Sequence, residues 1–256
     1  MRPMNPVFPI GAYLFPFLLI LLRLSMVVFM LPLWSSKQIP RSFKIGFALA
    51  LAFVLTPVVR VDTAGLPLVT VILQEWILGT VLGLAVRVLF LGVELAGTFI
   101  SDAMGLSLAT VFNPEMGQST EVSTLLGLLA MLLFLALDLH HDLIALIIKS
   151  FEVLPAGRIR TENLLKEGIA LGGQVFALAL KMAAPVLVSL FVVNLLMGFI
   201  YKAAPQVNIF FVSLPVYILV GFLVLFFSLP VLIQFLENRF AGLEETVIRL
   251  FTVSKG

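Results

Sequence analysis

The chain lacks cysteine altogether, so it has no disulfide framework, no thiol nucleophile and no thiolate metal site. Histidine occurs only twice, and no H-E-x-x-H zinc motif, phosphate-binding loop or dinucleotide-binding fingerprint is present. No serine or cysteine nucleophile can be matched to a histidine and an acid. The sequence therefore predicts no catalytic, cofactor-binding or metal-binding residues, and we expect neither an enzyme nor a cofactor.

Charge is scarce as well. Only 12% of the residues are charged and 61% are hydrophobic, whereas soluble domains are about a quarter charged and half apolar. A net charge of +2 with scattered basic residues does not form the basic stripe of a nucleic-acid-binding protein. We therefore expect a membrane protein that does not bind nucleic acid.

Six long apolar stretches account for the hydrophobicity. They are Phe8 to Trp34, Ile45 to Val59, Leu66 to Ile100, Val122 to Leu137 with a polar break before Ile148, Ile169 to Tyr201, and Val207 to Leu236. A helix needs roughly 20 apolar residues to cross about 30 Å of hydrocarbon, so some stretches are short for one crossing and others long. The sequence predicts an all-α, polytopic membrane protein forming one helical unit over residues 1–256 and leaves the number of crossings open.

The basic residues do not fit a simple alternating topology. If the six stretches alternate across the bilayer and the N-terminus is cytoplasmic, most Lys and Arg fall inside, as the positive-inside rule requires. However, Lys37, Arg41 and Lys44 then cluster in one short outside loop. We therefore leave open a topology in which one stretch does not cross.

Small residues four apart predict close helix packing. Gly79 with Gly83 and Gly168 with Gly172 form GxxxG pairs, while Gly46 with Ala50 and Gly92 with Ala96 are weaker pairs. Such spacing lets helix backbones approach closely in lipid, where no hydrophobic force drives association.

Ionisable residues inside the apolar stretches predict polar contacts between helices or subunits. They are Arg23, Glu75, Arg87, Glu94, Asp138, His140, His141, Asp142 and Lys181. Each costs roughly 2.5–3.5 kcal/mol if charged at mid-bilayer, so partners or water must offset it. Arg87 and Glu94 lie about 10.5 Å apart along a helix, and we expect each to meet a charge elsewhere.

The run from Asp138 to Asp142 offers four polar groups. In a continuous helix Asp138 and Asp142 share a face, but His140 and His141 point about 100° apart, so both cannot join them. We favour a polar helix end over a metal site, and leave a proton relay open because intramembrane carboxylates often serve that role.

Residues 101–121 form the most informative connection. Met104, Leu106, Phe112 and Met116 are large apolar side chains in a segment that also contains Gly105 and Gly117. Methionine adapts well to irregular surroundings. The segment either packs against its own core or forms a deformable seal in a passage.

Residues 203–211 read AAPQVNIFF and are followed by Pro215 and Gly221. This segment resembles the A-P-Q-x-N-x-F-F…P…G signature of the FliR family of the flagellar type III export apparatus. The signature residues are Pro205, Gln206, Asn208, Phe210 and Pro215. The resemblance continues through Pro32-Leu33-Trp34, Glu75 with Gly79 and Gly83, Glu94 to Gly97, Asn113-Pro114, His140-His141, and Ser150-Phe151…Leu154-Pro155…Gly157. Virulence-type secretion homologues share only parts of this pattern.

The resemblance implies slanted, proline-broken helical hairpins in the bacterial inner membrane at the flagellar basal body. It implies a gate assembled with FliP and FliQ that docks with FlhB and FlhA and passes unfolded flagellar subunits. It also implies that residues 101–121 form a central plug, with Met104, Gly105, Leu106, Phe112, Met116 and Gly117 at the channel.

Two other classes stay open. An ion-coupled secondary transporter would use Glu75, Glu94 and Asp142 for protons, and would be expected to have symmetric halves, which the sequence lacks. A scaffold would only nucleate assembly of its partners.

Overall fold

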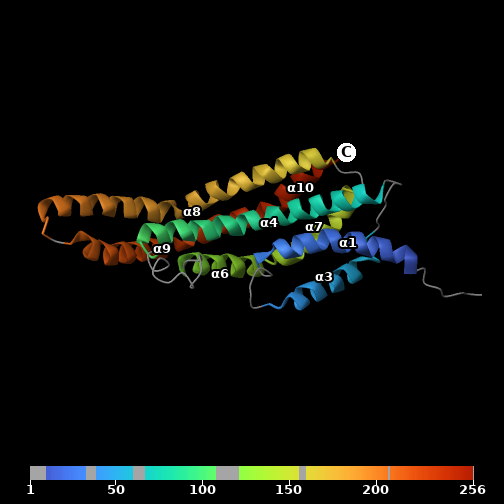
Figure 1. Ribbon diagram of the computed structural model, residues 1–256, viewed down its shortest axis with the longest axis horizontal. Helices are drawn as coiled ribbons and strands as arrows, with labels where there is room; N and C mark the ends of the chain where they lie inside the picture. Colours follow the sequence, from blue (N-terminus) through green and yellow to red (C-terminus); the bar gives the residue numbers. More distant parts are fainter. Residues whose placement is uncertain are drawn as a thin grey trace, which may run out of the picture. The chain divides into compact units, whose positions relative to one another are not determined.

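The computed structural model describes residues 10–32, 39–59, 67–107, 121–155, 160–206 and 208–255. Every regular element in these ranges is an α-helix (Figure 1). The helices are α1 (Ile10–Met30), α3 (Arg41–Leu55), α4 (Leu68–Met104), α6 (Glu121–Ala136), α7 (Leu139–Val153), α8 (Thr161–Ala203), α9 (Ile209–Ala241) and α10 (Leu243–Ser254). The predicted all-α fold class is confirmed.

Four helical segments are long and apolar enough to cross a membrane, and the pair α6 and α7 counts as a fifth if it forms one broken span. The four are Tyr13–Met30, Leu68–Met104, Thr161–Ala203 and Phe211–Ser254. Helix α3 has only 15 residues, or about 22 Å, and does not reach across about 30 Å of hydrocarbon. The topology prediction did not say which stretch fails to cross, and α3, in the second apolar stretch, is too short a helix for one crossing.

Contacts divide the chain into two compact units. The first contains residues 1–87, 138–172 and 242–256, and the second contains residues 88–137 and 173–241. Helices α4 and α8 each contribute residues to both units.

In the first unit, α3 packs along α1, and the short α10 packs against α7 (Figure 1). The start of α8 is tied to the end of α10 by two hydrogen bonds. The Arg160 backbone N–H donates to the Ser254 carbonyl at 3.1 Å, and Asn163 Nδ2 donates to the Val253 carbonyl at 3.2 Å. These bonds fix the C-terminal helix to the polar first turn of α8.

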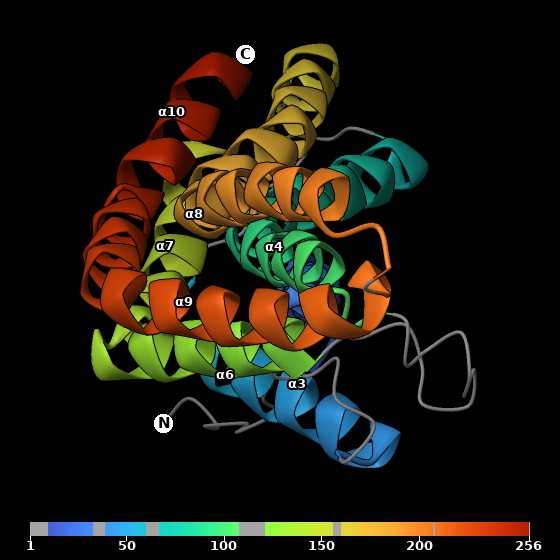
Figure 2. The ribbon, with the colours of Figure 1, turned by 90° about the vertical axis from the view of Figure 1, so that its left-hand side faces the viewer.

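In the second unit, α9 runs along α6 (Figure 2). Three rings from α4, α6 and α9 form its aromatic core: Phe90, Phe134 and Phe240 lie with centroids 5.6–6.0 Å apart. Their edge-on and tilted geometries are those that aromatic pairs prefer.

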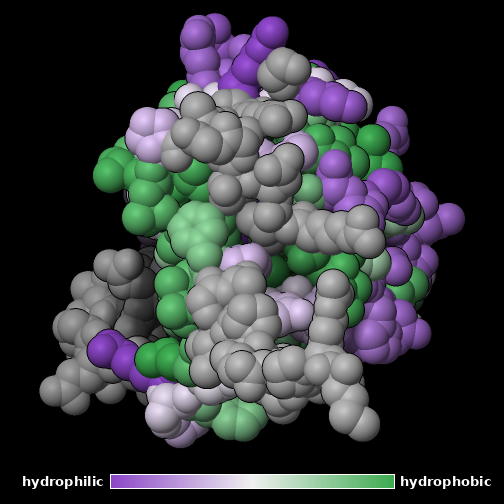
Figure 3. All heavy atoms as spheres, turned by 90° about the vertical axis from the view of Figure 1, so that its right-hand side faces the viewer, coloured by the Kyte–Doolittle hydropathy of each residue, from purple (hydrophilic) through white to green (hydrophobic). Residues whose placement is uncertain are grey.

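Side-chain polarity follows the helix patterns. On the face drawn in Figure 3, hydrophilic side chains gather along the upper and right-hand edges, and hydrophobic side chains lie mainly toward the left and the middle. Helix α10 buries Leu243, Val247, Leu250 and Phe251, which recur at the three- and four-residue spacing of an amphipathic helix.

The structure differs from the sequence expectation in three places. Residues 101–104, expected in the connection over residues 101–121, form the last turn of α4. Residues 161–168, which lie outside the six apolar stretches, are the first turns of α8. Helix α10 was not expected at all, because its apolar residues form a stripe rather than a run. In contrast, α7 ends at Val153, just before Pro155, where proline disfavours continued helix.

Candidate functional site

The most polar point inside the first unit is a buried ion pair between Arg23 of α1 and Glu75 of α4. Both side chains have no exposed surface. Arg23 Nε donates to Glu75 Oε2 at 2.6 Å and Arg23 Nη2 donates to Oε1 at 2.7 Å. This two-point geometry is the strongest form of the arginine–carboxylate pair.

Helix α7 completes the surroundings of the guanidinium. Arg23 Nη1 donates to Ser150 Oγ at 2.8 Å, and Nη2 also donates to the Leu154 carbonyl at 3.3 Å. The Ser150 hydroxyl in turn donates to the Ile147 carbonyl at 2.6 Å. The guanidinium carbon lies 3.6 Å from the centroid of the Phe151 ring, close enough for a cation–π contact.

This arrangement, which we call the Arg23 node (Arg23, Glu75, Ser150, Phe151 and Leu154), gives the S-F-x-x-L pattern a physical meaning. One residue of the pattern supplies a hydroxyl, the next a ring and the last a carbonyl to the same cation. From the sequence, Arg23 and Glu75 are each predicted to make polar contacts, but not with each other. Their opposite charges inside two apolar stretches were the available signal.

Glycine lets α1 and α4 approach closely beside the node. A Cβ at Gly79 would lie 2.7 Å from the Arg23 carbonyl oxygen, and one at Gly83 would lie 2.8 Å from the Met30 side chain. The prediction that this GxxxG pair packs a helix interface is confirmed. For the second pair, a Cβ at Gly168 would meet Val81 at 3.2 Å, but Gly172 has nothing within 4 Å among the described residues.

In the second unit, α4 ends in a defined capping structure. The Gly105 N–H donates to the Asp102 carbonyl at 3.1 Å, the Leu106 N–H donates to the Ser101 carbonyl at 3.0 Å, and Gly105 has φ 78°. These two bonds around a left-handed glycine form a Schellman motif. Gly105, which we expected in the plug, here ends the helix.

Met104, the last residue of α4, is fully buried. A Cβ at Gly221 of α9 would lie 2.6 Å from both Met104 Cγ and Cε, so the missing side chain of Gly221 makes room for this methionine. Leu106 is half-buried. Phe112, Met116 and Gly117, with Asn113 and Pro114, lie outside the described residues.

The polar run at the start of α7 does not continue the preceding helix. Asp138 has φ 55° and ψ 20°, which separates α6 from α7. His141 Nδ1 lies 3.7 Å from Asp138 Oδ1, and the two histidine rings are 4.0 Å apart. The prediction that both histidines cannot lie beside the carboxylate is wrong, because it assumed a continuous helix. With the left-handed turn, donor atoms of Asp138, His140 and His141 lie within 4.8 Å of one another.

We nevertheless keep the interpretation of this run as a polar helix end. The Asp138 and His141 side chains are 74% and 70% exposed. The partial positive charge of a helix N-terminus also opposes a bound cation.

The other predicted polar residues are spread over three helices. Arg87 and Glu94 lie half-buried on α4, and the Glu94 carbonyl accepts a bond from Ser123 Oγ of α6 at 2.9 Å. Lys181 is exposed on α8, as is Asp142 on α7.

The signature residues mark the turn between α8 and α9. Pro205, Gln206 and Asn208 are exposed there, and Phe210 belongs to the first turn of α9. Pro215 is exposed within α9. Val207 and the Phe210 side chain lie outside the described residues, as do Leu33 and Trp34.

Comparison with known proteins agrees with this pattern. A family model described as bacterial export proteins, family 1, matches residues 14–243. The flagellar biosynthetic protein FliR of Bacillus subtilis is 32% identical over 94% of this chain and 96% of its own length. FliR of Pectobacterium carotovorum is 31% identical over 95% and 94%, and FliR of Escherichia coli is 28% identical over 86% and 87%. The chain belongs to the FliR family of bacterial export proteins.

Proposed function

We propose that this flagellar export protein is a structural subunit of the export gate in the bacterial inner membrane. It would assemble with FliP and FliQ at the flagellar basal body, dock with FlhB and FlhA, and form part of the channel for unfolded flagellar subunits. The chain would bind no nucleic acid and no cofactor.

The uncovered α8–α9 hairpin carries this proposal. Helix α8 has 43 residues, or about 65 Å, roughly twice the hydrocarbon thickness. Only 22% of its most apolar window is buried, against 61% for α4. Rings such as Phe199, Phe211 and Phe227 are 70–74% exposed.

Lipid alone does not account for so long an apolar surface, because a helix of this length extends beyond the hydrocarbon on at least one side. Soluble surfaces rarely leave contiguous apolar patches of this kind, which mark interaction sites. Neighbouring subunits packed against the α8–α9 hairpin would cover this apolar surface.

A transporter mechanism receives less support. Glu75, one of the three acids such a mechanism would use, is held by two bonds from Arg23 and has no exposed surface. Asp142, the third acid, is exposed at the start of α7. In this proposal the chain therefore forms part of the channel and carries out no ion-coupling chemistry. The energy for export comes from other components.

We further propose that residues 101–121 supply the plug. The described part supports an anchored start for it: Met104 is buried against Gly221, and the helix end at Gly105 has a fixed hydrogen-bond pattern. Met104 and Gly105 would then hold the plug in position, while the channel contacts come from later residues.

A deletion of residues 107–117 tests the plug, since it spares Gly105 and Leu106 and so keeps the end of α4. We expect the gate to assemble but to leak small ions, measured as dissipation of the membrane potential in cells that express the variant. A second variant replaces the same residues with a glycine–serine segment of equal length and is expected to leak as well, because it lacks the apolar side chains. Unchanged impermeability of both assembled variants would contradict the plug and favour a scaffold.

A further inference from the structure

Helix α8 contains a long segment without any charged residue. Lys181 and Lys202 are both exposed, and the residues between them, 182–201, include no acid and no base. This segment extends about 30 Å as a helix, which matches the thickness of the hydrocarbon in a bilayer. Lysines at the ends of a membrane helix reach toward the lipid headgroups. We therefore expect residues 182–201 to lie at the depth of the hydrocarbon.

Asn194 lies inside this segment, about 12 Å from Lys202 and about 20 Å from Lys181 along the helix. Its side chain is exposed. The Tyr217 hydroxyl of α9 donates to Asn194 Oδ1 at 3.0 Å, so the amide oxygen is paired within the chain. The amide nitrogen Nδ2 carries two N–H donors, and neither has an acceptor among the described residues.

The surroundings of Asn194 leave protein as the source of an acceptor for Nδ2. Lipid chains offer no hydrogen-bonding group at this depth, and the headgroups lie beyond the two lysines. Ser189 of the same segment avoids this problem, because its hydroxyl donates to the Pro185 carbonyl of its own helix at 2.8 Å. Asn194 therefore differs from Ser189 in having a donor group that no described part of the chain satisfies.

The surface beside Asn194 has room for another helix. A cavity of about 220 Å³ is lined by Ala103 of α4, Leu187, Leu190, Phe191 and Asn194 of α8, and Tyr217 of α9. One turn beyond Asn194, a Cβ built at Gly198 would have nothing within 4 Å among the described residues. Glycine at this spacing lets the backbone of a second helix approach closely.

We propose that Asn194 and Gly198 form a contact site for a helix of a neighbouring subunit in the gate. The Asn194 amide would donate to a backbone carbonyl of that helix, which Gly198 allows to come near, and an apolar side chain of the same helix would fill the cavity beside Phe191. Hydrogen bonds from asparagine and close approach at small residues both hold membrane helices together. This contact rests on the proposed function, because it requires protein to cover the α8–α9 hairpin.

Competition between parent and variant chains for a place in the gate tests the contact. Both full-length chains are co-expressed with the proposed partners FliP and FliQ, and native mass spectrometry compares their ratio in the hetero-oligomer with their ratio in the membrane. Asn194→Leu with Tyr217→Phe removes the amide and leaves no Tyr217 hydroxyl without an acceptor. The incorporation of this variant should fall about threefold, the average effect of one hydrogen bond between membrane helices.

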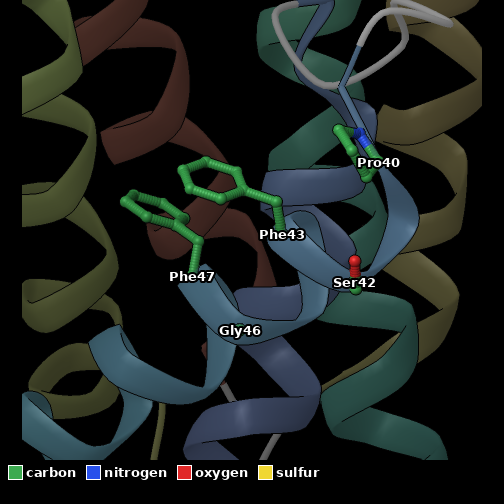
Figure 4. Close-up of a pocket in the computed structure, with 5 residues that line it drawn as sticks. All are labelled: Pro40, Ser42, Phe43, Gly46 and Phe47. Atoms are coloured by element: carbon green, nitrogen blue, oxygen red, sulfur yellow. The ribbon is translucent and has the colours of Figure 1, made fainter.

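Gly198→Leu should lower incorporation as well, although its new side chain begins in space that no described residue occupies. Two control variants should match the parent. Ser189→Ala removes a polar group of the same segment that is already paired. Gly46→Leu places a leucine at another glycine whose Cβ would meet nothing within 4 Å among the described residues. That glycine lies in α3, in a pocket lined by Pro40, Ser42, Phe43, Gly46 and Phe47 (Figure 4).

A photoreactive side chain at the cavity identifies what lies against it without changing Asn194. Phe191 is 62% exposed, and its replacement by p-benzoylphenylalanine keeps an aromatic ring at this position. Irradiation of the assembled gate should join this chain covalently to another subunit. The same chain expressed without partners should give no such adduct.

Two results would overturn the contact and leave the proposed function intact. In the first, the hetero-oligomer assembles but the photoreactive group at residue 191 reacts only with lipid. In the second, the Asn194 and Gly198 variants both compete as well as the parent chain. Recovery of the parent chain outside any hetero-oligomer would instead overturn the proposed function together with the contact.

Discussion

At the scale of single residues, Arg23 has the most demanding surroundings in the described structure. Its charge is fully buried, yet Glu75, Ser150 and the Leu154 carbonyl each accept hydrogen bonds from it. A buried ion pair is not necessarily stabilising relative to apolar residues, but breaking one side of it leaves an uncompensated charge. Replacing only one of Arg23 and Glu75 should therefore destabilise the fold, whereas replacing both with apolar residues should be tolerated.

Glu75→Gln should lower the stability of the protein by about 3–5 kcal/mol, because it leaves Arg23 buried without its counter-charge. The joint change Arg23→Met with Glu75→Leu should recover most of that loss, since no charge then remains to be desolvated. Thermal unfolding in detergent, followed by circular dichroism, measures both.

The control for this prediction is Glu162→Gln, which removes a surface pair with Lys166 at 2.7 Å. Exposed pairs contribute little, so its melting temperature should match the parent. If Arg23→Met with Glu75→Leu is as unstable as Glu75→Gln, the loss does not come from an unpaired buried charge, and this explanation is contradicted.

Gly221 and Gly46 form a matched pair of glycines within helices. Gly221→Ala should destabilise the protein by about 1–3 kcal/mol, because the new methyl group would overlap Met104 Cγ and Cε and overpack the site. A Cβ at Gly46 has nothing within 4 Å among the described residues, so Gly46→Ala should stabilise the helix by about 1 kcal/mol. Denaturant titration compares the two, and similar effects at both positions would rule out the Met104 contact.

At the scale of helices, the sequence predicts a helix correctly where its apolar run is long. It does not reveal geometry that depends on a single turn. The runs ending at Ile100, Tyr201 and Leu236 correspond to α4, α8 and α9. Helix α10 was not predicted because its apolar residues recur every three or four positions among polar ones and form no long run. The left-handed turn at Asp138 could not be inferred, because aspartate has no strong requirement for that conformation.

The same limit applies to the candidate site. The pattern Ser150-Phe151…Leu154 and the acid Glu75 were visible in the sequence, but only packing of α1, α4 and α7 brings them to Arg23. Likewise, the family resemblance placed Gly105 in the plug. The structure gives it a specific capping role at the end of α4.

Gly105→Ala should destabilise the end of α4 by about 1–2 kcal/mol, because a Cβ disfavours the left-handed backbone at φ 78°. Gly105→Asn should cost less, since asparagine tolerates this conformation and is found at such caps. Hydrogen exchange of the amides of residues 101–106 reports the loss locally. Equal protection in both variants and the parent would show that the cap does not hold the helix end.

At the scale of the whole molecule, the chain contains more apolar helix surface than it buries. Helices α8 and α9 contribute most of the exposed aromatic residues, and the most apolar part of the segment from Phe211 to Ser254 is only 17% buried. Interrupted helices such as α9, with Pro215 and Pro230 inside it, suit packing against other protein, where neighbours can satisfy freed backbone groups. The central claim is therefore that this surface is covered by partner subunits.

Native mass spectrometry after extraction in a mild detergent tests this claim most directly. When the full chain is co-expressed with FliP, FliQ and FlhB, our account predicts that it is recovered in one large hetero-oligomer with no free monomer. A stable monomer surrounded by detergent, with the partners recovered separately, would contradict the account.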